Sequence, residues 1–188
     1  MGITDGRFLG YRDSGMDGTP DNENPACLFR ADPSKVEAEV SALLDELKPD
    51  IVFTHDPTGG YGPPDLLTTY QRATAAVEAM TNDRPHLYYV CFPKSNFRKL
   101  WQEMTDAGIT PPFAKEEMEK IGSPDDYLTT VRDVSEYVDI KKESLNCHQT
   151  QLDPNGPFSA MAPEFMPAWM STEYFYLNHP KGGGSQED

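Results

Sequence analysis

Residues 51–65 read IVFTHDPTGGYGPPD, and this stretch decides the fold. The run from Ile51 to Thr54 is apolar and β-branched without interruption, which predicts a strand buried on both faces of a parallel sheet. A polar, glycine-rich loop follows from His55 to Gly62. Pro63 and Pro64 then fit only the start of a helix. The predicted helix carries apolar side chains at helical spacing, at Leu66, Tyr70, Ala73, Val77 and Met80.

The same alternation continues on both sides of this stretch. Asp32, which precedes a proline, predicts the N-cap of an upstream helix that ends at Pro49. Downstream, residues 87–92 predict a second strand and residues 97–104 an amphipathic helix. Residues 8–11 are an apolar run before a polar, glycine-rich stretch, and we expect a strand there too. The alternation indicates an α/β layered fold with right-handed crossovers.

The rest of the chain gives weaker signals. We predict two short strands within residues 127–140, a helix capped by Asp139 and a final strand at residues 173–177. Residues 179–188, which include three consecutive glycines, are expected to form a disordered tail. A length of 188 residues with 37% apolar content is sized for one domain, which we place at residues 1–178.

The balance of 31 acidic against 16 basic residues argues against two classes of partner. Nucleic acids and anionic membranes attract Lys and Arg, which replace their counterions, so both would repel this chain. No apolar run approaches the ~20 residues of a bilayer span, and no secretion signal follows Met1. We therefore expect a soluble, cytoplasmic protein. Cys27, Cys91 and Cys147 are odd in number and include no Cys-x-x-Cys pair, which predicts buried structural thiols rather than disulfides or a thiolate zinc site.

Two polar loops are the first candidates for a site, because ligands in open α/β sheets bind beyond the carboxyl ends of the strands. One is residues 11–16, which read YRDSGM, and the other is residues 55–65. In the second loop we predict that Gly59 and Gly60 contact the substrate, since glycine lets the backbone approach a ligand closely. The loop matches neither phosphate-binding glycine motif. Taken alone, such a turn is as typical of a structural connection as of a binding site.

Three segments together carry a family resemblance: YRDSGM at 11–16, KPDIVFTHDP at 48–57 and GGYGPPD at 59–65. In order and spacing they resemble the N-acetylglucosaminyl-phosphatidylinositol de-N-acetylase family, also called LmbE-like. HQTQ at 148–151 and GPF at 156–158 are similar to that family's closing region. Within the family, the chain looks closest to bacterial deacetylases and amidases that act on glucosaminyl-inositol thiols and similar sugar conjugates.

The resemblance implies a Rossmann-like layered sheet with helices on both faces. It also implies one zinc ion that activates water to attack the acetamide carbonyl of an N-acetylglucosaminyl conjugate. Such chemistry needs three protein ligands with an open coordination position, a carboxylate base and a polarising donor.

The chain departs from the family at the metal-binding positions. The family's first strand ends in a His-Pro-Asp-Asp segment that supplies two ligands and the base, and this segment is absent here. Met1 aligns with the approach to the family's third strand, so we expect the first two strands to be missing. Pro63 and Leu66 occupy the positions of two family histidines, and neither side chain can coordinate zinc or donate a hydrogen bond. We therefore expect no stably bound zinc and a weakly active or inactive protein, a pseudoenzyme.

The periphery of the family's site is retained. The resemblance implies that Arg12 and Asp13 bind sugar hydroxyls. It implies that Tyr61 assists the carbonyl oxygen of the substrate and that Asp65 orients a neighbouring histidine, which this chain lacks.

Each of these residues has a second interpretation. Asp13 is also typical of an Asx turn, and the ring of Tyr61 could pack over its loop instead of contacting a ligand. His55 could form a replacement metal site with Asp56 and His148. Isolated histidines are more often hydrogen-bonded structural residues than metal ligands.

Three functional hypotheses follow. The first is a degenerate zinc de-N-acetylase, the second a non-catalytic sugar-binding or assembly subunit that pairs with a complete relative, and the third a fragment of a longer deacetylase. Loss of the family's first strand would expose the edge of the strand at residues 51–54. We expect either that the strand at residues 8–11 pairs with this edge directly, or that a homo-oligomer or a complete relative covers it.

Overall fold

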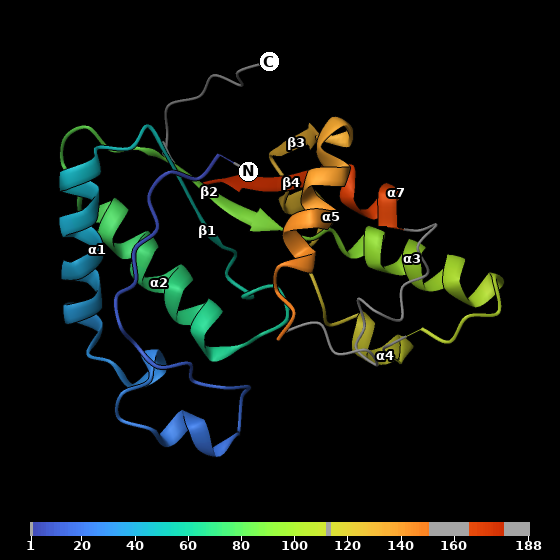
Figure 1. Ribbon diagram of the computed structural model, residues 1–188, viewed down its shortest axis with the longest axis horizontal. Coiled ribbons are helices and arrows are strands. Elements are labelled where there is room, and N and C mark those ends of the chain that lie inside the picture. The colour runs from blue at the N-terminus through green and yellow to red at the C-terminus, as the bar shows by residue number, and fades with distance from the viewer. Residues whose placement is uncertain (1, 112–113, 151–165, 179–188) are drawn as a thin grey trace. The chain divides into compact units, whose positions relative to one another are not determined.

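The computed structural model describes residues 2–111, 114–150 and 166–178 (Figure 1). Strands and helices alternate along these residues, and the strands of the sheet are ordered β1-β2-β4-β3. The predicted α/β class is therefore confirmed.

The described residues form two compact units, and each is considered separately. The N-terminal unit takes its described residues from the ranges 6–91 and 175–178, and the C-terminal unit takes them from the ranges 2–5 and 92–174. The boundary falls within the last strand, β4 (Thr172–Leu177). That residues 1–178 act as one domain stays a prediction.

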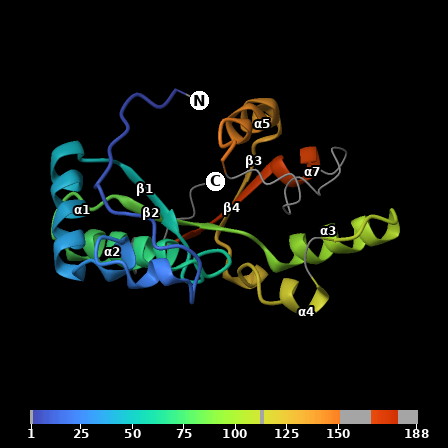
Figure 2. The same ribbon diagram turned by 60° about the horizontal axis from the view of Figure 1, so that its bottom comes forward.

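The N-terminal unit is built on a parallel pair of strands covered by two helices. β1 (Ile51–His55) pairs in parallel with β2 (His86–Cys91). α2 (Pro64–Ala79) connects these strands and packs on β1, while α1 (Pro33–Leu47) packs on α2. Figures 1 and 2 show α1 and α2 side by side.

Local sequence signals set the ends of both helices. Asp32 caps α1 by accepting a hydrogen bond from the backbone N–H of Lys35 at 3.1 Å, and Lys48 ends the helix in the left-handed conformation. α2 begins at Pro64, where a missing N–H has no cost because the first helical N–H groups lack partners within the helix. Both predicted helices are confirmed.

The core of this unit lies between the β1–β2 pair and α2. Side chains that alternate along β2 point into it, and apolar residues of α2 meet them. The buried residues are Leu87, Tyr89 and Cys91 on the strand with Ala76 and Val77 on the helix.

The prediction that β1 is buried on both faces is wrong. Ile51 and Phe53 are 48% and 55% exposed. Since β1 is the outer strand, no neighbouring strand lies along its outer edge within the described residues, and α2 covers only the opposite face. The Phe53 ring stacks on Tyr88 at 5.5 Å and contacts Phe175 at 5.2 Å between ring centroids. Phe53, Tyr88 and Phe175 therefore form a short aromatic row in which Phe53 is about half exposed and Phe175 is buried.

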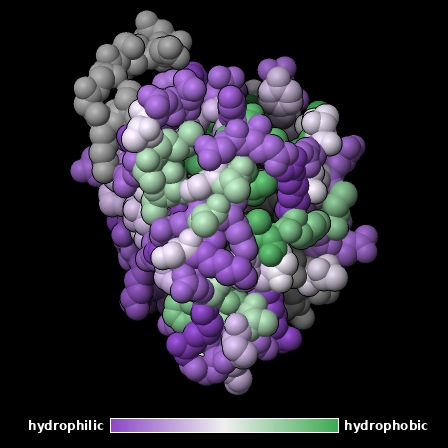
Figure 3. Space-filling view, turned by 90° about the vertical axis from the view of Figure 1, so that its left-hand side faces the viewer, coloured by the Kyte–Doolittle hydropathy of each residue, from purple (hydrophilic) through white to green (hydrophobic). Residues whose placement is uncertain are grey.

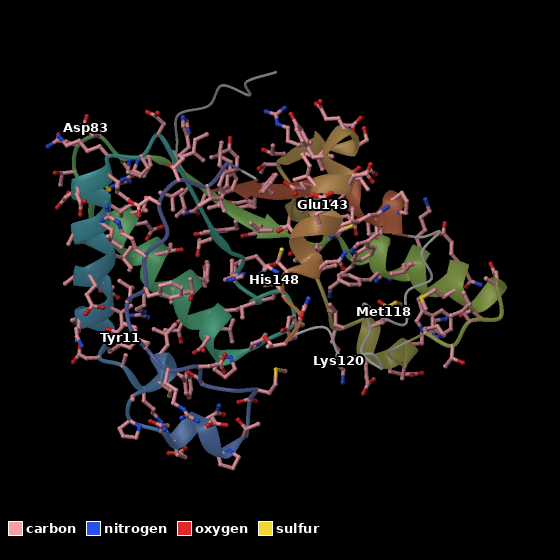
Figure 4. All side chains as sticks on the ribbon, in the orientation of Figure 1. Tyr11, Asp83, Met118, Lys120, Glu143 and His148 are labelled. Atoms are coloured by element: carbon pink, nitrogen blue, oxygen red, sulfur yellow. The ribbon has the colours of Figure 1, made fainter. Side chains whose placement is uncertain are left out.

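The predicted strand at residues 8–11 is also wrong, because this segment pairs with no strand in the part of the chain that the structure describes. Polar side chains instead hold it along α1. Arg7 forms a bidentate ion pair with Glu46 at 2.8 and 2.9 Å, and the Tyr11 hydroxyl donates to Glu39 at 2.7 Å. Figure 4 shows Tyr11 beside α1. Burial and then the Glu39 carboxylate raise the pKa of Tyr11 to about 12. Direct pairing of this segment with β1 therefore does not occur.

The C-terminal unit and the loops hold the remaining elements. The C-terminal unit contains α3 (Lys94–Asp106), α4 (Lys115–Met118), β3 (Thr130–Asp133), α5 (Val138–Asn146), α7 (Met166–Met170) and the start of β4. Short 3₁₀ helices occupy Pro20–Glu23, Leu28–Arg30, Asp125–Tyr127 and Ser135–Tyr137. α3 and β4 confirm the predicted amphipathic helix and final strand.

Two predictions for the C-terminal unit need correction. Residues 127–140 hold one strand, β3, rather than two. α5 begins at Val138, just before the predicted cap Asp139, because the 3₁₀ turn at Ser135–Tyr137 continues directly into the helix. The predicted tail and most of the segment that resembles the family's closing region lie outside the described residues.

Predictions about the surface, membrane spans and the cysteines can also be compared with the structure. The face of the molecule around α1 is largely hydrophilic (Figure 3), in keeping with the acidic composition. No helix in the described ranges is long and apolar enough to cross a membrane. Cys27 and Cys91 are buried as predicted, whereas Cys147 is exposed.

Candidate functional site

The glycine-rich loop after β1 is organised by a buried carboxylate. Asp56 is 1% exposed, and its Oδ1 accepts hydrogen bonds from the N–H of Thr58 at 3.0 Å, the hydroxyl of Thr58 at 2.7 Å and the N–H of Gly60 at 3.0 Å. The Asp56 carbonyl also accepts from the N–H of Gly59 at 2.9 Å. The turn after β1 is therefore closed by hydrogen bonds within the loop itself.

Glycine is required at Gly59 for two reasons. Its φ is +61°, and a β-carbon there would lie 3.2 Å from side-chain atoms of Leu66 and Leu67. Gly60 also has a positive φ, but the space around it is open. The N–H groups of both glycines already bond within the loop, so a ligand would meet other atoms of these residues. The predicted contact of Gly59 and Gly60 with the substrate stays a prediction.

Ser14 ties the first loop to the start of α2. It is fully buried, its N–H donates to Asp65 Oδ2 at 2.9 Å, and its hydroxyl donates to Asp65 Oδ1. The hydroxyl also accepts from the N–H of Phe29 at 3.0 Å, and the Ser14 carbonyl accepts from the side-chain amide of Asn22. Residues 11–16 and 55–65 are thus hydrogen-bonded to each other, and we call the Ser14–Asp65 pair the joint.

The residues predicted to face the substrate are exposed. Arg12 pairs with Asp21 at 2.6 Å in a solvent-exposed ion pair, and Asp13 accepts from the N–H of Gly15 at 2.7 Å. The Asx turn is therefore present, although the exposed Asp13 carboxylate keeps capacity to accept further bonds. Tyr61 is 61% exposed, so its ring is not packed over the loop. Sugar contacts by these residues stay a prediction.

The positions that correspond to family histidines hold no metal ligand. Pro63 is buried just before α2, and Leu66 lies in the first turn of that helix, with its Cβ 3.2 Å from the place that a β-carbon on Gly59 would occupy. Neither side chain has an oxygen, nitrogen or sulfur atom. Both oxygens of Asp65 accept hydrogen bonds from Ser14. The residues present at this position do not fit a zinc ion.

The two histidines considered for a replacement metal site belong to different units. His55 ends β1, and burial lowers its pKa below the usual 6.5 against the opposing effect of Asp56. His148 is exposed after α5, with its Nδ1 3.0 Å from the carbonyl of Ser144. Among the residues that the structure describes, no three His, Cys, Asp or Glu side chains form a group that could hold a metal. His55 and Asp56 belong to one unit and His148 to the other, so a metal site made of all three stays a prediction.

Comparison with known proteins identifies the family. No family model matches the chain. Proteins named 1D-myo-inositol 2-acetamido-2-deoxy-alpha-D-glucopyranoside deacetylase are similar to it. Those of Acidothermus cellulolyticus and Saccharomonospora viridis are 34% and 33% identical over the whole chain, which covers 68% and 71% of their lengths. That of Thermobifida fusca is 34% identical over 95% of this chain and 67% of its own.

The chain belongs to this deacetylase family. Membership confirms the LmbE-like resemblance carried by residues 11–16, 48–57 and 59–65. The chain spans about two thirds of the length of the curated relatives it matches. The relatives are named for a substrate that joins an acetamido sugar to inositol.

Three residues hold the loops of the candidate site in place, and that role was not predicted for them from the sequence. Ser14 and Asn22 received none, and Asp56 was considered only as a metal ligand. All three are buried polar residues whose partners are hydrogen-bonding groups of the loops. The partner of Ser14 is Asp65, 51 positions away, so no local pattern shows the pairing. The Asp-x-Thr-x-Gly spacing after β1 is the local signal that could have indicated the turn around Asp56.

Proposed function

We propose that this chain binds the sugar part of an N-acetylglucosaminyl-inositol conjugate and hydrolyses its acetamide weakly or not at all. The observation that carries the proposal is the joint, which connects the two predicted sugar-binding loops through Ser14 and Asp65. Beside it, Pro63 and Leu66 provide no metal ligand.

The binding half of the proposal rests on exposed polar side chains that stand on hydrogen-bonded loops. Arg12 offers donors and Asp13 an acceptor, which are the two functions that sugar hydroxyls pair with. Tyr61 adds an accessible hydroxyl and an aromatic face. Because the loops already have their shape, little conformational freedom would be lost when a sugar binds.

The catalytic half of the proposal rests on the metal ligands that Pro63 and Leu66 do not provide. The family resemblance implies a zinc-bound water as the nucleophile, and such a site needs three protein ligands and an open position. Pro63 and Leu66 cannot supply ligands, because their side chains have no donor atom for a metal. We therefore assign the two loops, residues 11–16 and 55–65, to substrate contact rather than to hydrolysis.

Calorimetric titration with a synthetic N-acetylglucosaminyl-inositol tests the binding half. The wild-type protein should bind saturably. Asp13→Asn should weaken binding about tenfold or more, because a hydrogen bond to a charged acceptor contributes about 1.5–3 kcal/mol. Asp17→Asn, at an exposed aspartate further along the same loop, should leave the affinity unchanged. Absence of saturable binding, or equal effects of the two substitutions, would refute this half.

Zinc content and acetate release test the catalytic half. After dialysis against a weak chelator, the protein should hold much less than one zinc per chain and release no acetate. The double variant Pro63→His and Leu66→His should still release none, because a general base would remain absent. One zinc per chain that resists the chelator, or acetate release from the double variant, would show that other residues supply the ligands or the base.

An assembly role is the second candidate function. The observation that favours it is the outer edge of β1, where Ile51 and Phe53 are about half exposed and no strand of the described chain pairs. Such an edge pairs readily with a strand of another chain. We propose a second copy of this protein or a complete deacetylase relative as the partner.

A further inference from the structure

The joint lies directly beside a predicted sugar contact. The peptide group between Asp13 and Ser14 supplies the N–H that donates to Asp65 Oδ2 at 2.9 Å. The Ser14 hydroxyl donates to the other oxygen of the same carboxylate. Asp13 is therefore fixed next to a two-point attachment to α2.

Ser14 is closed off from water, and its polar groups are in use. Its exposed fraction is 0%, its hydroxyl accepts from the N–H of Phe29 at 3.0 Å, and its carbonyl accepts from Asn22. Water cannot replace these bonds, so a truncated side chain would leave buried groups unpaired. A hydroxyl suits the position because it can donate to Asp65 and accept from Phe29 at once.

Close neighbours connect Asp65 to the second loop. Asp65 precedes Leu66, whose Cβ lies 3.2 Å from the place that a β-carbon on Gly59 would occupy. The carbonyl of Gly59 accepts from the N–H of Tyr61 at 2.9 Å. A path of hydrogen bonds and neighbouring residues thus runs from Asp13 to Tyr61.

We propose that Ser14 is a positioning residue for sugar binding. It fixes Asp13 relative to the turn that carries Tyr61, so that one sugar conjugate meets both side chains in an arrangement that exists before it binds. This inference rests on the proposed function, because it places the conjugate at these two loops.

A double-mutant cycle on sugar affinity tests the proposal. Ser14→Ala should weaken binding of N-acetylglucosaminyl-inositol about ten- to hundredfold, and Ser14→Thr, which keeps the hydroxyl, should restore most of it. Asp65→Ala should have a similar effect. The double variant Ser14→Ala and Asp65→Ala should lose no more than either single variant, because the two residues act as one unit. Additive losses would overturn the proposal.

Asp32→Ala separates positioning from a general loss of stability. It removes the cap of α1, which lies outside both loops, and should lower the unfolding midpoint while leaving sugar affinity unchanged. If this variant weakens binding as much as Ser14→Ala does, the effect of Ser14 is one of stability alone, and the proposal is wrong.

Backbone amide chemical shifts of the sugar-free protein give a readout that needs no ligand. Ser14→Ala should shift the signals of Gly60 and Tyr61 in the second loop as well as that of Phe29, and Asp32→Ala should shift none of them. If the wild-type protein fails to bind sugar but these shifts occur, the proposed function is wrong and the positioning role stands. Shifts confined to residues 11–30 would overturn the positioning role whether or not sugar binds.

Discussion

The joint and the outer edge of β1 are built in opposite ways, although both belong to the N-terminal unit. Around the joint, Ser14 and Asn22 are buried polar residues whose side chains bond within the protein. At the edge, Ile51 and Phe53 are apolar but 48% and 55% exposed. No strand of the described chain lies along this edge.

The contrast separates two possible kinds of function. A polar network whose groups are bonded internally specifies one shape by itself, which suits the recognition of a small ligand. An apolar strand edge is completed by another strand, which suits assembly. Ligand contacts are therefore expected on the two loops that the joint connects, and any assembly at β1.

The largest expected effect is at the buried carboxylate of the second loop. Asp56→Ala removes the acceptor of three hydrogen bonds. It should lower the free energy of unfolding by about 2–3 kcal/mol, because donors that bonded a charged group are left without it. Urea unfolding followed by circular dichroism measures the change. Asp17→Ala, at an exposed position, should change it by less than about 0.5 kcal/mol. Equal effects would show that the turn does not depend on Asp56.

A gain in stability is expected at Thr54. Its hydroxyl oxygen is buried without a hydrogen-bond partner among the described residues, whereas the hydroxyl of Thr58 donates to Asp56 at 2.7 Å. Thr54→Val should therefore raise the free energy of unfolding by about 1 kcal/mol, and Thr58→Val should lower it by a similar amount. The same urea experiment compares them. A loss at Thr54 would mean that its hydroxyl is bonded in solution.

A smaller effect, which depends on pH, is expected at His55. Burial lowers its pKa in the folded protein, so the unfolded chain binds the proton more readily. Its contribution to stability is complete above about pH 6.5 and declines as the pH falls from that value toward the lower folded pKa. His55→Gln should reduce the loss of stability between pH 7.5 and 5.5, while His148→Gln at an exposed position should not. An unchanged pH profile in His55→Gln would assign the titration to other groups.

Local sequence signals predicted where α1 and α2 begin. Features that depend on residues far apart in the sequence were missed. The cap at Asp32 and the proline start of α2 act through neighbouring backbone groups, so the sequence shows both. The exposure of Phe53 depends on β1 being the outer strand, which no property of residues 51–54 reveals. The burial of Ser14 likewise depends on a partner 51 positions away.

The smallest change in stability is expected at the edge of β1. Ile51→Lys places a charge on a half-exposed strand residue and should change the free energy of unfolding by about 0.5 kcal/mol or less. It should nevertheless weaken any association through this edge, because a lysine on an edge strand opposes pairing with another chain. Leu47→Lys is the matched control, since Leu47 is 54% exposed but lies at the end of α1.

Light scattering across a range of protein concentrations, with and without a complete deacetylase relative, measures this association. The wild-type protein and Leu47→Lys should associate alike, and Ile51→Lys should remain monomeric. Backbone groups alternate between the two sides of a strand, so those of Ile51, Phe53 and His55 point to the same side of β1. A partner strand on that side would protect the three N–H groups from hydrogen exchange together. Association that survives Ile51→Lys would place the interface elsewhere. A wild-type monomer at all concentrations, alone and with the relative, would leave β1 as an open edge that the protein tolerates, and would remove the assembly role.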